Sequence, residues 1–379
     1  MNVSTSARVV AILAEARLFA TARGRSRTEQ MVECSTRLGG MFAWSVEQGR
    51  FAREMMKPET ASACEGGRFR VPRPPVVPGV KVLRSLASSD AGVASYQATG
   101  RSGEPLRVLT SMSSEPRRLA ADTRIAGILQ GLIPDRYVPA PRADVVRMLD
   151  DVALIATLDS DLDQEADGLQ LAAKSNTFGS PRVVFHRRDV LVLTEASGTS
   201  VEELPAPERA AVYDTAVADW ARTLLEDRIL IVSLRRDRLL AHDGQLCLSR
   251  WSGAHEPSAD ALALLRNLMA AAFSTAESTR QEAGDHAAQI VADGLGVEGS
   301  LDAIKIPILA LLSNQDQVLP SRKIVLQIVG RQSSKYSQHS RVEMLQLLRQ
   351  LVWLRDLAAA SGVSDLTRPW RQLALDLGC

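Results

Sequence analysis

Residues 190–204 read VLVLTEASGTSVEEL, and at this stretch strand-like sequence gives way to helical sequence. Its apolar first four residues, together with Arg182–Phe185, have the pattern of a compact β-like pair. Two earlier strand-like runs, Val93–Ala98 and Leu106–Leu109, are separated by a Gly-Arg-Ser-Gly turn and predict a hairpin. The sequence therefore predicts a small sheet that is complete by about residue 194.

Helical composition dominates the rest of the chain. It extends up to Lys57, and a segment rich in glycine and proline, Gly66–Gly79, then interrupts it. Further helices are predicted where Ala and Leu recur at helical spacing: Pro116–Leu132, Asp144–Ala173, Pro207–Leu225, and from Ala259 to the end with breaks at Gly294–Gly299 and Gly362. The order of helices, small sheet, short linker and helical domain predicts an α+β chain.

Composition excludes several classes of protein. The 379 residues are 45% hydrophobic and carry a formal net charge of +1, so no overall field favours nucleic acid. The cysteines lack the close spacing of a zinc or redox motif: Cys34, Cys64, Cys247 and Cys379. No apolar run is long enough to span a membrane, and the start does not have the pattern of a signal peptide. We expect a cytoplasmic protein without metal, nucleic acid or transmembrane segment; peripheral membrane association stays open.

Five segments resemble motifs of the UbiB (AarF) family of atypical kinases, in the family's order. They are the N-terminal family helix at LGGMFAWSVEQ from Leu38, the alanine-rich loop and lysine strand at Ala87–Leu109, the acidic helix motif DSDLDQEADGL from Asp159, the strand and hinge at Val190–Leu204, and the catalytic loop, hairpin and metal-binding turn at Asp227–Ser252. Leu319 and Pro320 also precede a typical late helix of the family, so the resemblance spans roughly Leu38 to Gly330. Their shared order makes chance similarity an inadequate explanation.

The resemblance implies a two-lobed, protein-kinase-like α+β fold that is predominantly helical. Residues 1–77 would form an N-terminal helical extension and linker. Residues 78–198 would form the kinase-like N-lobe, and residues 199–379 the helical C-lobe. The cleft between the lobes would then be the place to look for chemistry.

The positions that carry phosphoryl transfer in the family are substituted here. Transfer needs a lysine on the phosphates, an aspartate near the accepting hydroxyl, and an asparagine and an aspartate on magnesium. By resemblance, these positions are occupied in turn by Leu109, Ser233, Arg238 and Arg250. The glutamate that would position the lysine survives as Glu165, and without that lysine we expect it to be solvated or paired locally.

Charge decides whether such a site is merely weakened. Two unit charges ~4 Å apart interact by about 4 kcal/mol at an effective dielectric near 20. Arg250 in place of a metal-ligating aspartate reverses the sign of that interaction, so magnesium is repelled. The sequence therefore predicts a pseudokinase that holds no cofactor, magnesium-ATP included. An alternative acid, Asp237, would need a shift of the loop by one residue.

Three functions remain open from the sequence. The leading one is a scaffold or regulator that binds a partner protein, and the family's association with isoprenoid lipids suggests a lipid-pathway assembly. The second is a metal-independent sensor of an anion or nucleotide, in which forked hydrogen bonds come from cleft arginines: Arg235, Arg236, Arg238 and Arg250. The third is an unconventional ATPase or kinase. Asp227 and Asp237 lie nearby in sequence, so a charge-paired surface loop is the competing interpretation of the arginines.

Overall fold

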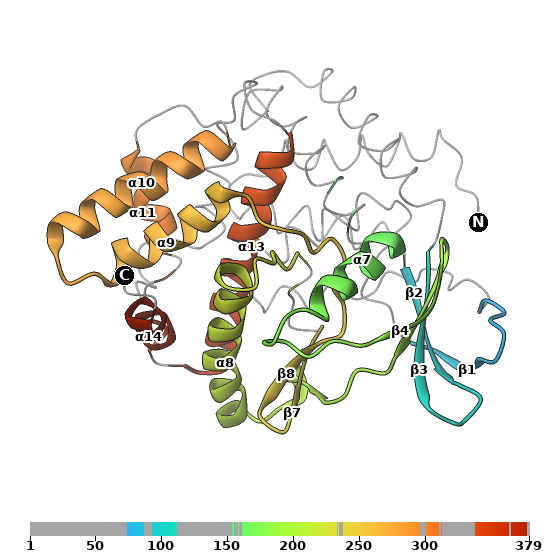
Figure 1. Ribbon diagram of the computed structural model, residues 1–379. Helices are drawn as coiled ribbons and strands as arrows, with labels where there is room; N and C mark the ends of the chain where they lie inside the picture. The colour runs from blue at the N-terminus through green and yellow to red at the C-terminus, as the bar shows by residue number, and fades with distance from the viewer. Residues whose placement is uncertain are drawn as a thin grey trace, which may run out of the picture. The chain divides into compact units, whose positions relative to one another are not determined.

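The structure is a computed structural model that describes part of the chain (Figure 1). The described residues are 74–86, 93–111, 154, 158, 161–232, 234, 238–295, 301–310, 312, 338–363 and 365–376. The chain divides into two compact units, one comprising Met1–Asp163 and Arg182–Glu195, the other Gln164–Pro181 and Ala196–Cys379. Both helices and sheets are present, which confirms the predicted α+β class.

The first unit contains a five-stranded antiparallel sheet with the order β1-β2-β3-β5-β4. Its strands are β1 (Lys81–Leu86), β2 (Val93–Thr99), β3 (Pro105–Ser111), β4 (Val183–Arg187) and β5 (Val190–Thr194). β2 and β3 form a hairpin, and Gly103, with φ of 85°, takes the left-handed conformation that its turn requires. β4 and β5 form a second hairpin. Both strand pairs expected from the sequence are confirmed.

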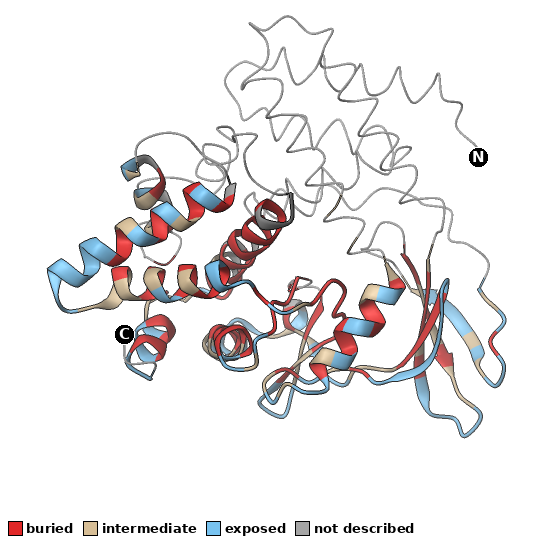
Figure 2. Ribbon diagram, turned by 45° about the horizontal axis from the view of Figure 1, so that its top comes forward, coloured by how far each residue is buried: buried red, intermediate tan, exposed pale blue. Residues whose placement is uncertain are grey.

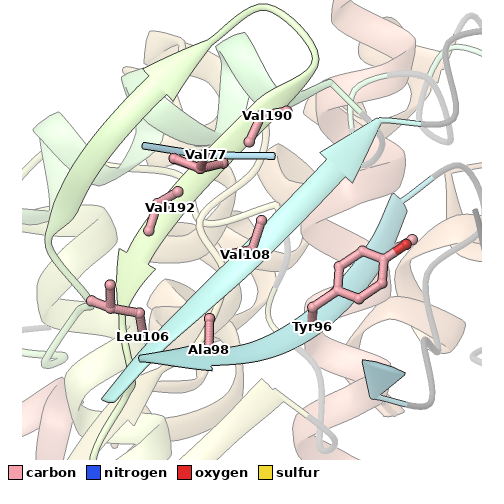
Figure 3. Packing of buried hydrophobic residues seen from close by; sticks show 8 residues of the cluster. Val77, Tyr96, Ala98, Leu106, Val108, Val190 and Val192 are labelled. Carbon is pink, nitrogen blue, oxygen red and sulfur yellow. The ribbon is translucent and has the colours of Figure 1, made fainter. Parts of the chain in front are cut away.

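Apolar side chains bury both faces of the central strands. One face carries the cluster drawn in Figure 3, made of Val77, Ala94, Tyr96, Ala98, Leu106, Val108, Val190 and Val192. Successive side chains alternate between faces, so Leu109, Leu191 and Leu193 lie on the opposite face, where they are also buried. Strands buried on both faces have nearly continuous apolar sequence, which is why the VLVL run was informative.

The second unit combines helices with a short three-stranded sheet in the order β6-β7-β8. The helices described are α7 (Leu162–Ala172, whose first two residues belong to the first unit), α8 (Ala206–Leu225), α9 (Ala259–Phe273), α10 (Glu277–Leu295), α11 (Asp302–Ala310), α13 (Gln338–Ala360) and α14 (Arg368–Asp376). The predicted helix Pro207–Leu225 and the helix start at Ala259 are confirmed. α10 ends at Leu295, within the predicted break, and Gly362 follows α13 with φ of 67°.

The strands of the second sheet are β6 (Thr199–Ser200), β7 (Leu239–His242) and β8 (Gln245–Leu248). The two-residue turn between β7 and β8 has positive φ at both Asp243 and Gly244, 48° and 79°. Asp-Gly is the sequence that such a type I′ hairpin turn prefers. The hairpin expected within Asp227–Ser252 is therefore confirmed.

Aromatic residues fix the helical core of the second unit. The rings of Trp220 on α8 and Trp370 on α14 meet edge to face, with centroids 5.8 Å apart. The indole N–H of Trp220 donates to Gln350 on α13, and the Tyr213 hydroxyl donates to the Leu366 carbonyl. Figure 2 shows α13 buried along most of its described surface. Trp220 therefore fills the core of the second unit.

One helix prediction is wrong in its extent. The helix expected over Asp144–Ala173 does not continue through Asp161, because α7 begins only at Leu162. The Asp161 carboxylate accepts a hydrogen bond from the backbone N–H of Asp163 at 2.9 Å, which is the geometry of an N-cap. The predicted N-terminal helical extension and the Pro116–Leu132 helix lie outside the described residues. No helix within the described stretches is long and apolar enough to cross a bilayer.

Candidate functional site

Glu165 on α7 makes the most deeply buried ion pair in the described part of the second unit. Its Oε2 accepts a hydrogen bond from Arg250 Nε at 2.6 Å, and its Oε1 accepts one from the backbone N–H of Trp251 at 2.7 Å. The Glu165 side chain is fully buried and that of Arg250 is 4% exposed. We call these three residues the Glu165 cluster. The expectation that Glu165 is solvated or locally paired is wrong, since its partner is 85 residues away.

The local sequence explains how α7 reaches this position. Leu162, Ala166, Leu169 and Ala172 recur at helical spacing and are all buried, and Glu165 lies on the same stripe. Gly168 faces the backbone of Trp251 so closely that a Cβ at this position would lie 1.9 Å from the Trp251 carbonyl oxygen. Only a glycine allows that approach.

The segment after α7 and the β7–β8 hairpin hold the other half of the cluster in place. Gly179 pairs with β8: its N–H donates to the Leu246 carbonyl at 2.8 Å, and its carbonyl accepts from Leu248 at 2.9 Å. The N–H of Ser249 donates to the carbonyl of Arg238 at 2.9 Å and extends the hairpin toward Arg250. These backbone hydrogen bonds fix the position of the chain just before Arg250.

The residues singled out from sequence fall in different places. Leu109 is 1% exposed in β3 of the first unit, where its direct cross-strand neighbours are Ser95 and Leu191. Arg238 and Arg250 are buried in the second unit, and Arg250 bonds Glu165. The remaining positions lie outside the described residues: Ser233, Arg235, Arg236 and Asp237. The structure thus joins Arg250 to Glu165, a pairing that sequence reasoning missed.

The chemistry open to the Glu165 cluster is limited. Both carboxylate oxygens of Glu165 are engaged, one by a guanidinium and one by a backbone N–H, so the carboxylate is not available to another cation. Within the described residues, no three His, Cys, Asp or Glu side chains gather as a metal-ligand set. Immediately after Arg250, two buried polar atoms have no hydrogen-bond partner among the described residues, Trp251 Nε1 and Ser252 Oγ.

Three residues beyond this turn lies a second buried pair that the sequence gave no signal for. His255 Nδ1 donates to the Gly253 carbonyl at 2.8 Å, and its Nε2 lies 3.7 Å from Oε1 of Glu343 on α13. Glu343 also accepts the backbone N–H of Ser258 at 2.7 Å. Burial opposes a charged His255, but the attraction of the nearby Glu343 carboxylate and the hydrogen bond to the Gly253 carbonyl outweigh burial and raise the pKa of His255 above the usual 6.5. Burial likewise opposes a charged Glu343, but the nearby His255 ring and the hydrogen bond from Ser258 lower the pKa of Glu343 below the usual 4.5.

The His255–Glu343 pair is expected to give the fold a pH dependence. A raised histidine pKa contributes stability that is complete below pH 6.5 and is lost as pH rises through the folded-state value; a lowered glutamate pKa contributes stability that is lost as pH falls below 4.5. His255→Gln should therefore flatten the fall in unfolding free energy as the pH rises above 6.5. Urea denaturation at each pH measures this, with exposed His286→Gln as the control. Equal slopes for wild type and His255→Gln would contradict the assignment.

Comparisons with known proteins give matches among solved structures alone. No family model matches the chain, and no curated protein matches it. Among solved structures, the complex of Rv3197 with erythromycin from Mycobacterium tuberculosis is similar over 75% of this chain and 78% of that one, with 14% sequence identity and a TM-score of 0.44. At these values the likeness supports no statement about family or function.

Proposed function

We propose that this chain is a catalytically inactive, kinase-like protein of the UbiB/AarF type that acts as a scaffold or regulatory partner of another protein in the cytoplasm. The observation that carries the proposal is the Glu165–Arg250 pair. By resemblance, these positions belong to the glutamate that orients the phosphate-binding lysine and to the aspartate that binds magnesium. Here the two positions neutralise each other in a buried hydrogen-bonded pair.

The order of elements in the described residues supports a kinase-like arrangement. A three-stranded meander (β1–β3) comes first, followed by α7, the β4–β5 hairpin and a helical unit. This is the order of an N-lobe followed by a C-lobe. Leu109 adds support, because an apolar environment on β3 would impose a large desolvation cost on a lysine.

A metal-free anion sensor is the second candidate, and one observation favours it. The two residues immediately after Arg250 contain buried donors, Trp251 Nε1 and Ser252 Oγ. Neither donor has a hydrogen-bond partner among the described residues. Unpaired buried donors are costly, about 1–3 kcal/mol each, and a bound anion could satisfy them. The commitment of Arg250 Nε to Glu165 weighs against this candidate.

Magnesium-ATP is expected to leave the melting temperature of the full chain unchanged. A ligand that binds only the folded state adds RT ln(1 + [L]/Kd), about 2.7 kcal/mol at a hundredfold excess over Kd, so binding would be visible as a melting shift. The measurement compares magnesium-ATP, magnesium-ATP with EDTA, and sodium tripolyphosphate. An upward shift with magnesium-ATP that EDTA abolishes would sink the pseudokinase proposal. A shift with tripolyphosphate that ignores EDTA would favour the sensor.

The scaffold role has its own test. Affinity purification of the full chain from the cells that make it, at its native concentration, is expected to recover one protein in near-stoichiometric amount. Recovery of the chain alone, together with a tripolyphosphate-induced shift, would replace the scaffold by the sensor.

A further inference from the structure

Strand β4 is an edge strand whose five residues are all exposed, although the His186 side chain binds Asp163 at 2.9 Å. It pairs with β5 on one side, and within the described residues no strand pairs with its other side. Three consecutive apolar residues are exposed: Val183 39%, Val184 51% and Phe185 38%. Figure 2 shows the same contrast, with exposed β4 beside buried strands of the sheet.

The strand that pairs with β4 belongs to the buried part of the sheet. Its neighbour β5 is buried in four of its five residues, and Phe185, His186 and Arg187 pair with successive β5 residues, Val192, Leu191 and Val190. The register shifts between Val183 and Phe185, so the regular edge begins at Phe185. Val183–Phe185 itself contains none of the lysine, proline or inward-pointing charges that usually protect an exposed edge. A strand with open backbone groups and exposed apolar side chains can accept a further strand.

The charges around this edge select the kind of strand. Arg182, Arg187 and Arg188 flank the apolar residues and are exposed. Two acidic residues oppose these three arginines: Asp189, which lies 3.8 Å from Arg187, and Asp163, which lies 2.9 Å from His186. The segment is therefore basic at both ends. An extended peptide with apolar side chains in its middle and Asp or Glu at its ends is complementary to it.

Two other occupants fit less well. A second copy of the chain paired through β4 would bring arginines against arginines, and like charges across a strand pair are destabilising. A membrane could take up the apolar side chains but not the open backbone N–H and C=O groups, which remain unsatisfied in hydrocarbon. A peptide strand satisfies both requirements.

We propose that β4 is the docking strand for an extended acidic segment of a partner protein, which adds to the sheet as a sixth strand. This inference rests on the proposed scaffold function and names the surface through which that function works. Main-chain hydrogen bonds to β4 supply affinity, Phe185 is the apolar anchor, and the flanking arginines select acidic ends.

A display library of random ten-residue peptides, panned on the full chain, tests the proposal. Enriched peptides should carry apolar central residues between Asp or Glu. Phe185→Glu and Arg188→Glu should each weaken the best peptide by roughly tenfold or more, as loss of an interface anchor does. Leu83→Glu is the matched control, because Leu83 is exposed on the opposite edge strand β1, and binding there should stay within about twofold of wild type.

The backbone part is tested on the best peptide by methylating one amide nitrogen at a time. Amides of an added strand point alternately toward and away from β4, so methylation should abolish binding at every second position.

Three results would overturn the proposal: no peptide enriches, methylation weakens binding without alternation, or Leu83→Glu weakens binding as much as Phe185→Glu. Binding of phosphatidylserine vesicles that requires Phe185 without peptide enrichment would assign the edge to membranes, and a dimer lost in Phe185→Glu would assign it to a second copy. None of these outcomes depends on the response to magnesium-ATP, so failure here is distinct from failure of the proposed function.

Discussion

Replacing Glu165 with alanine is expected to lower the free energy of unfolding by about 3–5 kcal/mol, the usual cost of removing one partner of a buried ion pair. The change leaves the buried Arg250 guanidinium without its Nε acceptor and the Trp251 N–H without its acceptor. Chemical denaturation of the full chain, followed by circular dichroism, measures the loss.

Three further variants separate charge pairing from mere loss of atoms. Glu165→Gln keeps an acceptor oxygen and should lose less than Glu165→Ala. The double change Glu165→Leu with Arg250→Met removes both charges and should regain most of the stability, since apolar replacement of a buried pair is often neutral or better. Asp163→Ala, at an exposed surface pair with His186, should cost less than about 1 kcal/mol. A Glu165→Ala loss no larger than that of Asp163→Ala would show that the pair contributes nothing to the fold.

Gly168→Ala is expected to destabilise the protein by about 1–3 kcal/mol, against the general trend for helices. Alanine in a helix interior is normally better than glycine by about 1 kcal/mol. Here the new Cβ would lie 1.9 Å from the Trp251 carbonyl oxygen and 2.9 Å from its carbonyl carbon, so α7 must move away from backbone that cannot yield. Because Trp251 also donates its backbone N–H to Glu165, the movement of α7 also stretches the hydrogen bond within the Glu165 cluster.

Gly284→Ala in α10 provides the control for this prediction. Its Cβ would meet the Cδ of Lys305 at 3.0 Å, the flexible part of a long side chain, which can shift. That variant should be neutral or stabilised by up to about 1 kcal/mol. The two glycines responding alike in thermal melts would contradict the close approach at Gly168.

Local patterns predicted most of the secondary structure. The β2–β3 and β7–β8 hairpins follow from strand-like runs joined by Gly-Arg-Ser-Gly and Asp-Gly turns, which act within a few residues. Helix α8 follows from Ala and Leu at helical spacing. In each case the residues that determine the structure are neighbours in sequence.

The Glu165 cluster could not be predicted in the same way, because the two partners of Glu165 lie 85 and 86 residues further along the chain. One signal was present: Glu165 lies on the stripe of Leu162, Ala166 and Leu169, so α7 places it with buried residues. A charged residue on such a stripe requires a partner of opposite charge. The stripe could therefore have shown that a partner exists, but not that the partner is Arg250. The His255–Glu343 pair, also separated by a long stretch of chain, gave no comparable signal.

The Glu165–Arg250 pair also bears on how the sequence can change over evolutionary time. Substituting either residue alone leaves the other charge buried without its partner, so single-step paths away from the pair pass through a destabilised intermediate. Under the proposed kinase-like assignment, a lysine at position 109 alone would not restore phosphoryl transfer while Arg250 holds Glu165. The pair is therefore expected to stay fixed while selection acts on the outer surfaces of the molecule.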